Sequence, residues 1–210
     1  MLELFCANIQ GLEAVAEALP LSAYRREKLR QITNAQVLRQ SLGAELLLIQ
    51  AVRTLRPDAP LPLEIAVGDH GKPELIMDGL HFNLSHSGSR LLCGLSDSPL
   101  GVDVQQASPF RQALARRFFT EREYRSLLEE GDGGYAFTRL WCLKESYLKW
   151  LGQGLDRQLD TFELVFSDGE PRVEDDAGCR LRHWTEDSFH FALCASDKDS
   201  EISLQQLELP

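Results

Sequence analysis

The sequence predicts an α+β fold. Helical periodicity and short alternating strands occur together in both parts of the 210-residue chain, and one set of elements gives way to the next near residue 100. The order of the elements is too irregular for a repeating parallel α/β sheet. We therefore expect two similar α+β halves, residues 1–100 and residues 101–210.

Helices dominate the beginning of the chain. Residues 19–32 are predicted to form a short helix with Ser22 near its start. "TNAQ", residues 33–36, has the Thr-x-x-Gln form of a capping box and predicts a long helix that ends near Leu55. Gly43 lowers the helix propensity there, which indicates close packing against another element. The apolar stripe of this helix consists of Leu38, Leu42, Leu46, Ile49 and Val52.

Short strands follow in the middle of the chain. Alternating or apolar runs bounded by turn residues predict strands at 63–68, 74–77, 81–86, 90–96 and 100–105.

The second half begins with helices and ends with strands. A helix is expected at 110–119, and "TERE", residues 120–123, is a second capping box at which the helix should break and restart. The strongest helix is predicted from about Tyr135 to Leu151. Antiparallel strands are expected at 161–167, 179–185 and 189–196.

Composition narrows the classes of function. The net charge of −10 does not suit a nucleic-acid partner, which needs a basic face. No apolar run approaches the ~20 residues that span a bilayer, and the N-terminus has no basic lead-in of a secretory signal. Five scattered cysteines without a CxxC pair indicate a reduced, cytoplasmic protein. Basic residues nevertheless gather at 24–30 and 111–125, where they could serve a small anion or an acidic partner.

Polar residues alternate with valines in "GVDVQ", residues 101–105. Asp103 and Gln105 stand two apart on a predicted strand and point to one face, while Val102 and Val104 point to the other. An acid and an amide on one face can hold a hard cation such as magnesium. They can equally be the solvent-facing residues of an edge strand, and the pentapeptide alone favours that interpretation.

Charges also interrupt the apolar helix at 135–151. Trp141, Glu145 and Lys149 are successively four residues apart and share a helix face. A surface Glu–Lys pair is the simplest interpretation, but the apolar neighbours leave few directions for water. Charges in such a segment are expected to have a partner, such as a metal ion or a phosphate.

Polar residues that could bind an anion occur in or beside two glycine-containing turns of the first half. "NLSHSGS", residues 83–89, carries Ser85 and His86, which cannot readily pair as nucleophile and base because neighbours on a strand face opposite ways. They suit anion binding with the backbone of the glycine turn. Lys72 lies in the turn "GDHGKP", where a lysine by itself is usually solvated surface. The other histidines, His70, His81, His183 and His190, show no ligand spacing and are interpreted as structural.

Five segments in this order, "GKP", "NLSHS", "GVDVQ", "RFFTEREY" and "WCLKESYLKW", resemble those of the 4′-phosphopantetheinyl transferases, specifically the larger surfactin-synthetase-activating (Sfp) type. The resemblance covers essentially the whole chain. It implies a monomeric protein built as a pseudo-twofold pair of α+β halves, with the active site at their junction.

The resemblance also implies a reaction. Such an enzyme moves the phosphopantetheine arm of coenzyme A to a serine of an apo carrier protein or carrier domain and releases adenosine 3′,5′-bisphosphate. It needs Mg²⁺, and Mn²⁺ can replace this ion. Asp103 and Glu145 would bind the metal, with Gln105 at a third ligand position, and Lys149 would bind a phosphate of coenzyme A. Lys72, Ser85 and His86 would bind the nucleotide and its phosphates. Arg25 and Lys28 would bind the 3′-phosphate, and Arg39 is a weaker candidate for the same pocket.

Gln105 departs from the family pattern, because many members carry a second acid at this position. The departure leaves a catalytically weak or inactive protein that binds coenzyme A or a carrier as an alternative. A metal-dependent phosphohydrolase that uses Asp103 and Glu145 is a further alternative. We expect Glu145 to accept the proton of the carrier serine, directly or through a water. Glu123 of "RFFTEREY" is interpreted as structural, because it completes the capping box that begins at Thr120.

Overall fold

The computed structural model describes residues 1–12, 19–68, 70–153, 158–196 and 201–209. The chain forms two compact units, Met1–Ser98 with Ser200–Pro210, and Pro99–Asp199. Both units contain helices and strands, which confirms the α+β class. The division differs from the expected 1–100 and 101–210 at the C-terminus, because a strand from the last part of the chain pairs within the first unit.

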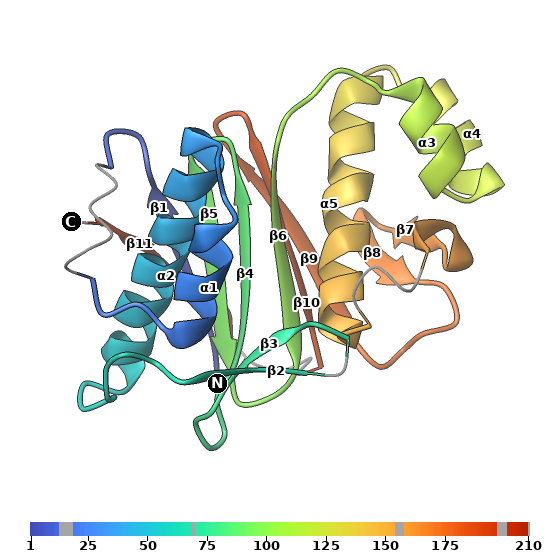
Figure 1. The fold of residues 1–210 in the computed structure, drawn as a ribbon. Helices are drawn as coiled ribbons and strands as arrows, with labels where there is room; N and C mark the ends of the chain where they lie inside the picture. The colour runs from blue at the N-terminus through green and yellow to red at the C-terminus, as the bar shows by residue number, and fades with distance from the viewer. Residues whose placement is uncertain (13–18, 69, 154–157, 197–200, 210) are drawn as a thin grey trace. The chain divides into compact units, whose positions relative to one another are not determined.

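The first unit is built on a sheet of strand order β11-β1-β5-β4. β1 and β11 pair in parallel, and the other pairs are antiparallel. The long helix α2 packs against this sheet and α1 packs against α2 (Figure 1). The elements of the unit are β1 (Leu2–Asn8), α1 (Ala23–Arg30), α2 (Ala35–Leu55), β2 (Ile65–Val67), β3 (Pro73–Leu75), β4 (His81–Ser87), β5 (Arg90–Ser96) and β11 (Ser203–Leu207).

The start of α2 corrects one detail of the sequence interpretation. Its N-cap is Asn34, whose side chain accepts hydrogen bonds from the backbone N–H groups of Gln36 and Val37, so the expected capping box from Thr33 to Gln36 is wrong. An asparagine oxygen serves the unpaired N–H groups of a first turn as well as a threonine does. The predicted stripe does face the core, since Leu42, Leu46, Ile49 and Val52 are buried and Leu38 is half-buried.

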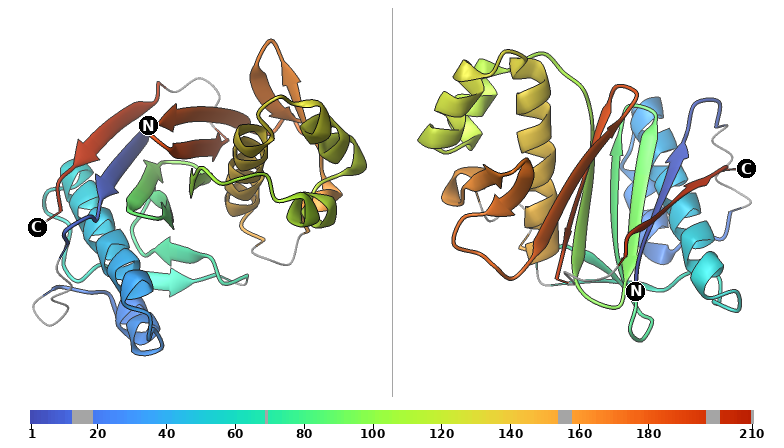
Figure 2. Two further views of the ribbon diagram at one scale, coloured as in Figure 1. Left: turned by 90° about the horizontal axis from the view of Figure 1, so that it is seen from above. Right: turned by 180° about the vertical axis from the view of Figure 1, so that it is seen from behind.

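The second unit places one long helix on a sheet of strand order β6-β10-β9, all antiparallel. Figure 2 shows α5 running along one face of this sheet. The elements are β6 (Leu100–Gln106), α3 (Gln112–Phe118), α4 (Glu121–Glu129), α5 (Gly133–Leu151), η3 (Leu159–Thr161), β7 (Leu164–Ser167), β8 (Glu170–Val173), β9 (Arg180–Glu186) and β10 (Phe189–Ala195). Among the described residues, none of the helices is both long enough and apolar enough to span a membrane.

A glycine brings α5 and β6 into direct contact. A Cβ atom added at Gly101 would lie 2.1 Å from the carbonyl oxygen of Ser146 and 2.3 Å from the backbone nitrogen of Trp150. Any side chain at this position would therefore collide with the helix backbone itself. The last two turns of α5 can lie against β6 only because residue 101 has no side chain.

We predict that Gly101→Ala lowers the free energy of unfolding by about 3 kcal/mol or more, because the helix backbone cannot turn away as a side chain can. Gly43→Ala is the matched control. Its Cβ would meet only side-chain atoms, 2.6 Å from Cγ2 of Ile9 and 2.9 Å from Cδ1 of Leu91, and alanine regains about 1 kcal/mol of helix propensity. Urea unfolding of both variants measures the difference, and equal losses would contradict this account of Gly101.

Candidate functional site

Asp103 is buried on the face of β6 that α5 covers. It lies two residues beyond Gly101 on the same strand face, and only 2% of it is exposed. Val102 and Val104 point to the opposite face and are fully buried there. The predicted alternation of "GVDVQ" is therefore confirmed, but the polar face is covered by a helix and is not open to solvent.

The side chains of Lys149 and Gln105 donate hydrogen bonds to the Asp103 carboxylate. The Lys149 ammonium lies 2.5 Å from Oδ1 and also donates to the carbonyl oxygen of Val102 at 3.1 Å. The Gln105 amide nitrogen donates to Oδ2 at 2.8 Å. Gln105 thus lies beside Asp103 as expected, with its nitrogen toward the carboxylate. Its role as a metal ligand stays a prediction.

Glu145 belongs to the same group of charges. It is half-buried on α5, one turn before Lys149. Burial raises the pKa of its carboxyl, and the negative charge of Asp103 raises it further, while the Lys149 ammonium lowers it. The charges of Asp103, Glu145 and Lys149 are therefore close enough to influence one another.

The adjacent Lys144 has a different task. Its side chain is fully buried, and its ammonium lies 2.6 Å from both carboxylate oxygens of Glu123 and 2.7 Å from the carbonyl oxygen of Phe162. Burial lowers the pKa of Lys144, and the charge of Glu123 opposes that shift. Glu123 also accepts from the backbone N–H groups of Leu164 and Thr120, so the predicted capping box is confirmed. The pair joins α4, α5 and the start of β7.

Sequence reasoning missed this buried ion pair. The signal that could have found it is a lysine inside an apolar helix, because a buried ammonium needs an anionic partner. Trp141, which shares a face with Glu145 in the helical pattern, packs against the rings of Phe118, Phe119 and Phe137 and belongs to the core.

The histidines of the second unit contact each other. Nε2 of His183 lies 3.1 Å from Nδ1 of His190, and the ring of Tyr135 packs against both. Burial lowers the pKa of His183 to about 4, with smaller contributions from the charges of His190 and Arg139. A neutral, packed pair agrees with the structural interpretation of these residues.

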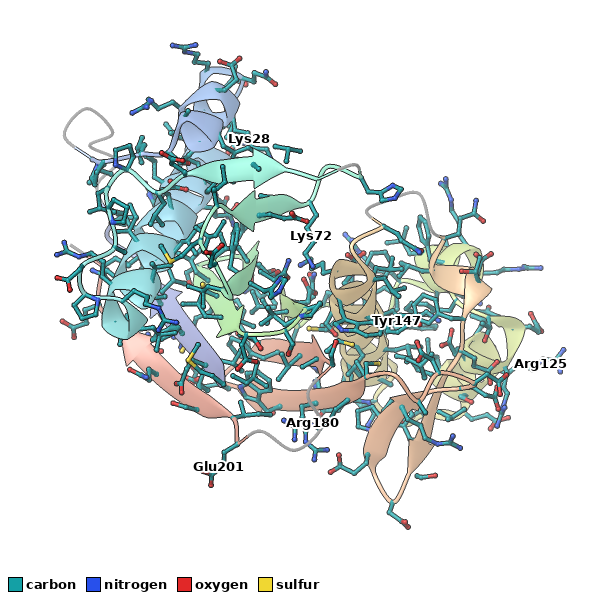
Figure 3. All side chains as sticks on the ribbon, turned by 90° about the horizontal axis from the view of Figure 1, so that it is seen from below. Lys28, Lys72, Arg125, Tyr147, Arg180 and Glu201 are labelled. Atoms are coloured by element: carbon teal, nitrogen blue, oxygen red, sulfur yellow. The ribbon has the colours of Figure 1, made fainter. Side chains whose placement is uncertain are left out.

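The candidate residues of the first unit lie on strand β4, on the turn between β2 and β3, and on helices α1 and α2. Ser85 is buried and His86 is exposed on β4, as expected for neighbours on a strand. Lys72 is half-buried at the turn between β2 and β3, where its carbonyl oxygen accepts from the N–H of Gly68. Figure 3 labels Lys72 at this turn and Lys28 on α1. Lys28 is exposed, with its ammonium 4.7 Å from the centroid of the Tyr24 ring.

Arg25 is occupied by a structural contact. Its Nε donates to the fully buried Glu45 at 3.2 Å, and one terminal nitrogen donates to the hydroxyl of Ser41 at 2.8 Å. These contacts join α1 to α2. A guanidinium has five N–H donors, so they still leave Arg25 able to bind a phosphate. Arg39 is exposed on α2.

The donor set in the second unit fits magnesium. Among the residues that the structure describes, no three His, Cys, Asp or Glu side chains come together as a metal cluster. Asp103 and Glu145 offer two carboxylates. Magnesium is typically held by one or two carboxylates, with waters and substrate phosphates as its other ligands.

Comparison with known proteins shows the family of the chain. Residues 99–202 match the family described as the 4′-phosphopantetheinyl transferase superfamily. A 4′-phosphopantetheinyl transferase of Bacillus subtilis is 30% identical over 187 residues, which are 85% of this chain and 84% of the relative. The 4′-phosphopantetheinyl transferase Sfp of Bacillus subtilis strain 168 is 28% identical, again over 187 residues that cover 85% of this chain and 84% of the relative.

Among solved structures, the holo-[acyl-carrier-protein] synthase of Thermotoga maritima matches at 26% identity and a TM-score of 0.41, over 47% of this chain and 62% of that chain. The sequence relatives extend over most of the chain. By that extent and identity, the chain belongs to the 4′-phosphopantetheinyl transferase superfamily, in its Sfp type.

Proposed function

We propose that the protein transfers the 4′-phosphopantetheine group of coenzyme A to a serine of an apo carrier protein or carrier domain. The observation that carries this proposal is the group of two carboxylates and one ammonium, Asp103, Glu145 and Lys149, where α5 meets β6. The names of the B. subtilis relatives support the same reaction.

The chemistry is a displacement at phosphorus. The serine oxygen attacks the β-phosphorus of coenzyme A, and the bond from that phosphorus to the oxygen shared with the α-phosphate breaks. The leaving group is adenosine 3′,5′-bisphosphate. The serine proton passes to Glu145, directly or through a water.

Positioning and charge would supply most of the rate. Asp103 and Glu145 would hold Mg²⁺, or Mn²⁺ in its place, with Gln105 beside them. The bound cation would spread the charge of the diphosphate and make its phosphorus easier to attack. Lys149 would bind a phosphate of coenzyme A.

Residues of the first unit are proposed to bind the nucleotide. Lys72, which is half-buried, and Ser85 and His86 on β4 would contact the nucleotide and its phosphates. Arg25 and Lys28, with Arg39, would contact the 3′-phosphate. We propose a monomeric, cytoplasmic enzyme, in keeping with five scattered cysteines.

Helix α3 is the proposed docking element for the carrier. Arg111, Arg116 and Arg117 are exposed at this helix, and within the described ranges none of the three makes an ion pair. The guanidinium of Arg117 lies 5.0 Å from the ring centroid of Phe118. Carrier proteins are typically acidic, so unpaired arginines beside an aromatic ring suit such a partner.

The central test weighs intact apo carriers by mass spectrometry after incubation with the protein, coenzyme A and Mg²⁺. We expect a carrier to gain one phosphopantetheine, and Glu145→Ala to abolish the gain. Glu121→Ala, which removes an exposed carboxylate paired with Arg125 on α4, is the control and should leave the gain intact. Release of free phosphopantetheine without a carrier would indicate a hydrolase. Binding of coenzyme A without any transfer would indicate a non-catalytic binding protein.

Gln105→Glu is expected to lower the Mg²⁺ concentration for half-maximal rate. A third carboxylate near the ion adds about 1 kcal/mol of attraction, or roughly a fivefold lower concentration. Initial rates over a series of Mg²⁺ concentrations measure the effect. An unchanged half-maximal concentration would count against a place for Gln105 at the metal.

Reversing Arg116 and Arg117 to glutamate is expected to raise the KM for the carrier about tenfold and to leave the KM for coenzyme A unchanged, because only the carrier meets α3. Arg125→Glu on α4 is the matched charge reversal and should change neither constant. Steady-state kinetics with each substrate varied in turn would test this, and equal effects on both substrates would exclude α3 as the docking element.

A further inference from the structure

Lys149 already has an anionic partner before any ligand binds. Its ammonium lies 2.5 Å from Oδ1 of Asp103, so the group proposed to bind a phosphate occupies the carboxylate proposed to bind the metal. We propose that Lys149 exchanges partners during binding: it neutralises Asp103 in the metal-free protein and moves to a phosphate of coenzyme A when a divalent cation takes Asp103. The proposal rests on the proposed function.

Burial explains why Asp103 needs a resident cation. Only 2% of Asp103 is exposed, and a buried carboxylate without a counter-charge is strongly destabilising. Gln105 donates a hydrogen bond to Oδ2 but carries no charge. Glu145, one turn before Lys149 on α5, adds a second carboxylate to this group. Among the contacts described for Asp103, the ion pair with Lys149 brings a positive charge to this carboxylate.

The same contact cannot persist beside a metal ion. An ammonium and a divalent cation on one carboxylate repel each other strongly, because little water separates them in a buried site. The diphosphate of coenzyme A offers the displaced ammonium new acceptors. Lys149 then makes an ion pair in both states, with a different partner in each.

The two lysines of α5 differ in their freedom to make this exchange. Lys144 is fully buried and contacts three oxygen atoms of Glu123 and Phe162. The side chain of Lys149 is 27% exposed and sits on a long stem with four rotatable bonds. Its ammonium can leave Asp103 without any movement of the helix.

An exchange of this kind couples the two ligands. Removal of Lys149 from Asp103 by the cation makes the ammonium available to coenzyme A, so each ligand raises the affinity for the other by the same factor.

The test uses the full chain with Mn²⁺ alone, without coenzyme A or a carrier. Lys149→Met keeps the length of the side chain and removes its charge, and Lys149→Arg is the matched control that keeps the charge. Calorimetric titration gives the Kd for Mn²⁺, and thermal unfolding gives Tm with and without saturating Mn²⁺.

For Lys149→Met we expect a metal-free Tm at least about 5 °C below that of the wild type, because Asp103 loses its counter-charge. Its Kd for Mn²⁺ should be at least about tenfold tighter, because the ion no longer competes with an ammonium. Saturating Mn²⁺ should close the gap in Tm. Lys149→Arg should stay near the wild type in both measurements.

If Lys149→Met has the Tm and the Kd for Mn²⁺ of the wild type, the exchange is wrong. It is also wrong if Lys149→Met has a lower Tm that saturating Mn²⁺ does not restore, or if the wild type binds no Mn²⁺. These results are separable from the transfer reaction. Failure to modify any carrier, with the expected Mn²⁺ results, would reject the transferase and keep the exchange. Normal transfer together with a Lys149→Met variant that binds Mn²⁺ like the wild type would reject only the exchange.

Discussion

The close approach of α5 to β6 is the constraint on which the candidate site depends. Gly101 lets the helix backbone lie directly against the strand, and Asp103, two residues further on the same face, thereby meets Lys149. The buried contact between Lys144 and Glu123 fixes the other side of the helix. With one side against the strand and another fixed by an ion pair, α5 has little freedom to rotate. The backbone of α5 thereby holds Glu145 one turn before Lys149, on the same face of the helix.

Each charge inside the apolar helix has its own explanation. Lys144 is a structural residue, whereas Glu145 and Lys149 belong to the candidate site. The end of the helix is further secured by polar contacts that leave the site free. The hydroxyl of Tyr147, labelled in Figure 3, donates to Asp176 at 2.6 Å, and the indole N–H of Trp150 donates to Ser196 at 2.8 Å. A site of this kind needs a rigid frame, since the positions of its charges decide the chemistry.

Local signals predicted well, and contacts between distant segments did not. The capping box at Thr120 and the packing role of Gly43 were readable because each depends on a few neighbouring residues or on one missing side chain. The strands β1, β8 and β11 were not predicted, since strands without strong alternation are defined mainly by their partners. The pairs of Lys144 with Glu123 and of Arg25 with Glu45 join separate elements, and nothing in the local sequence names the partner. The position of Asp103 and Gln105 on one face followed from period-two alternation alone.

The parallel pairing of β1 with β11 has a consequence for biosynthesis. β1 leaves the ribosome before its parallel neighbour β11, which begins at Ser203, after the whole second unit. At the usual ~5–20 residues per second, one edge of β1 waits about 10–40 s for its partner. A nascent chain therefore exposes an unpaired strand edge, a template for association with other chains, for longer than it takes to complete most single domains. Chaperone dependence during translation should accordingly concentrate on β1.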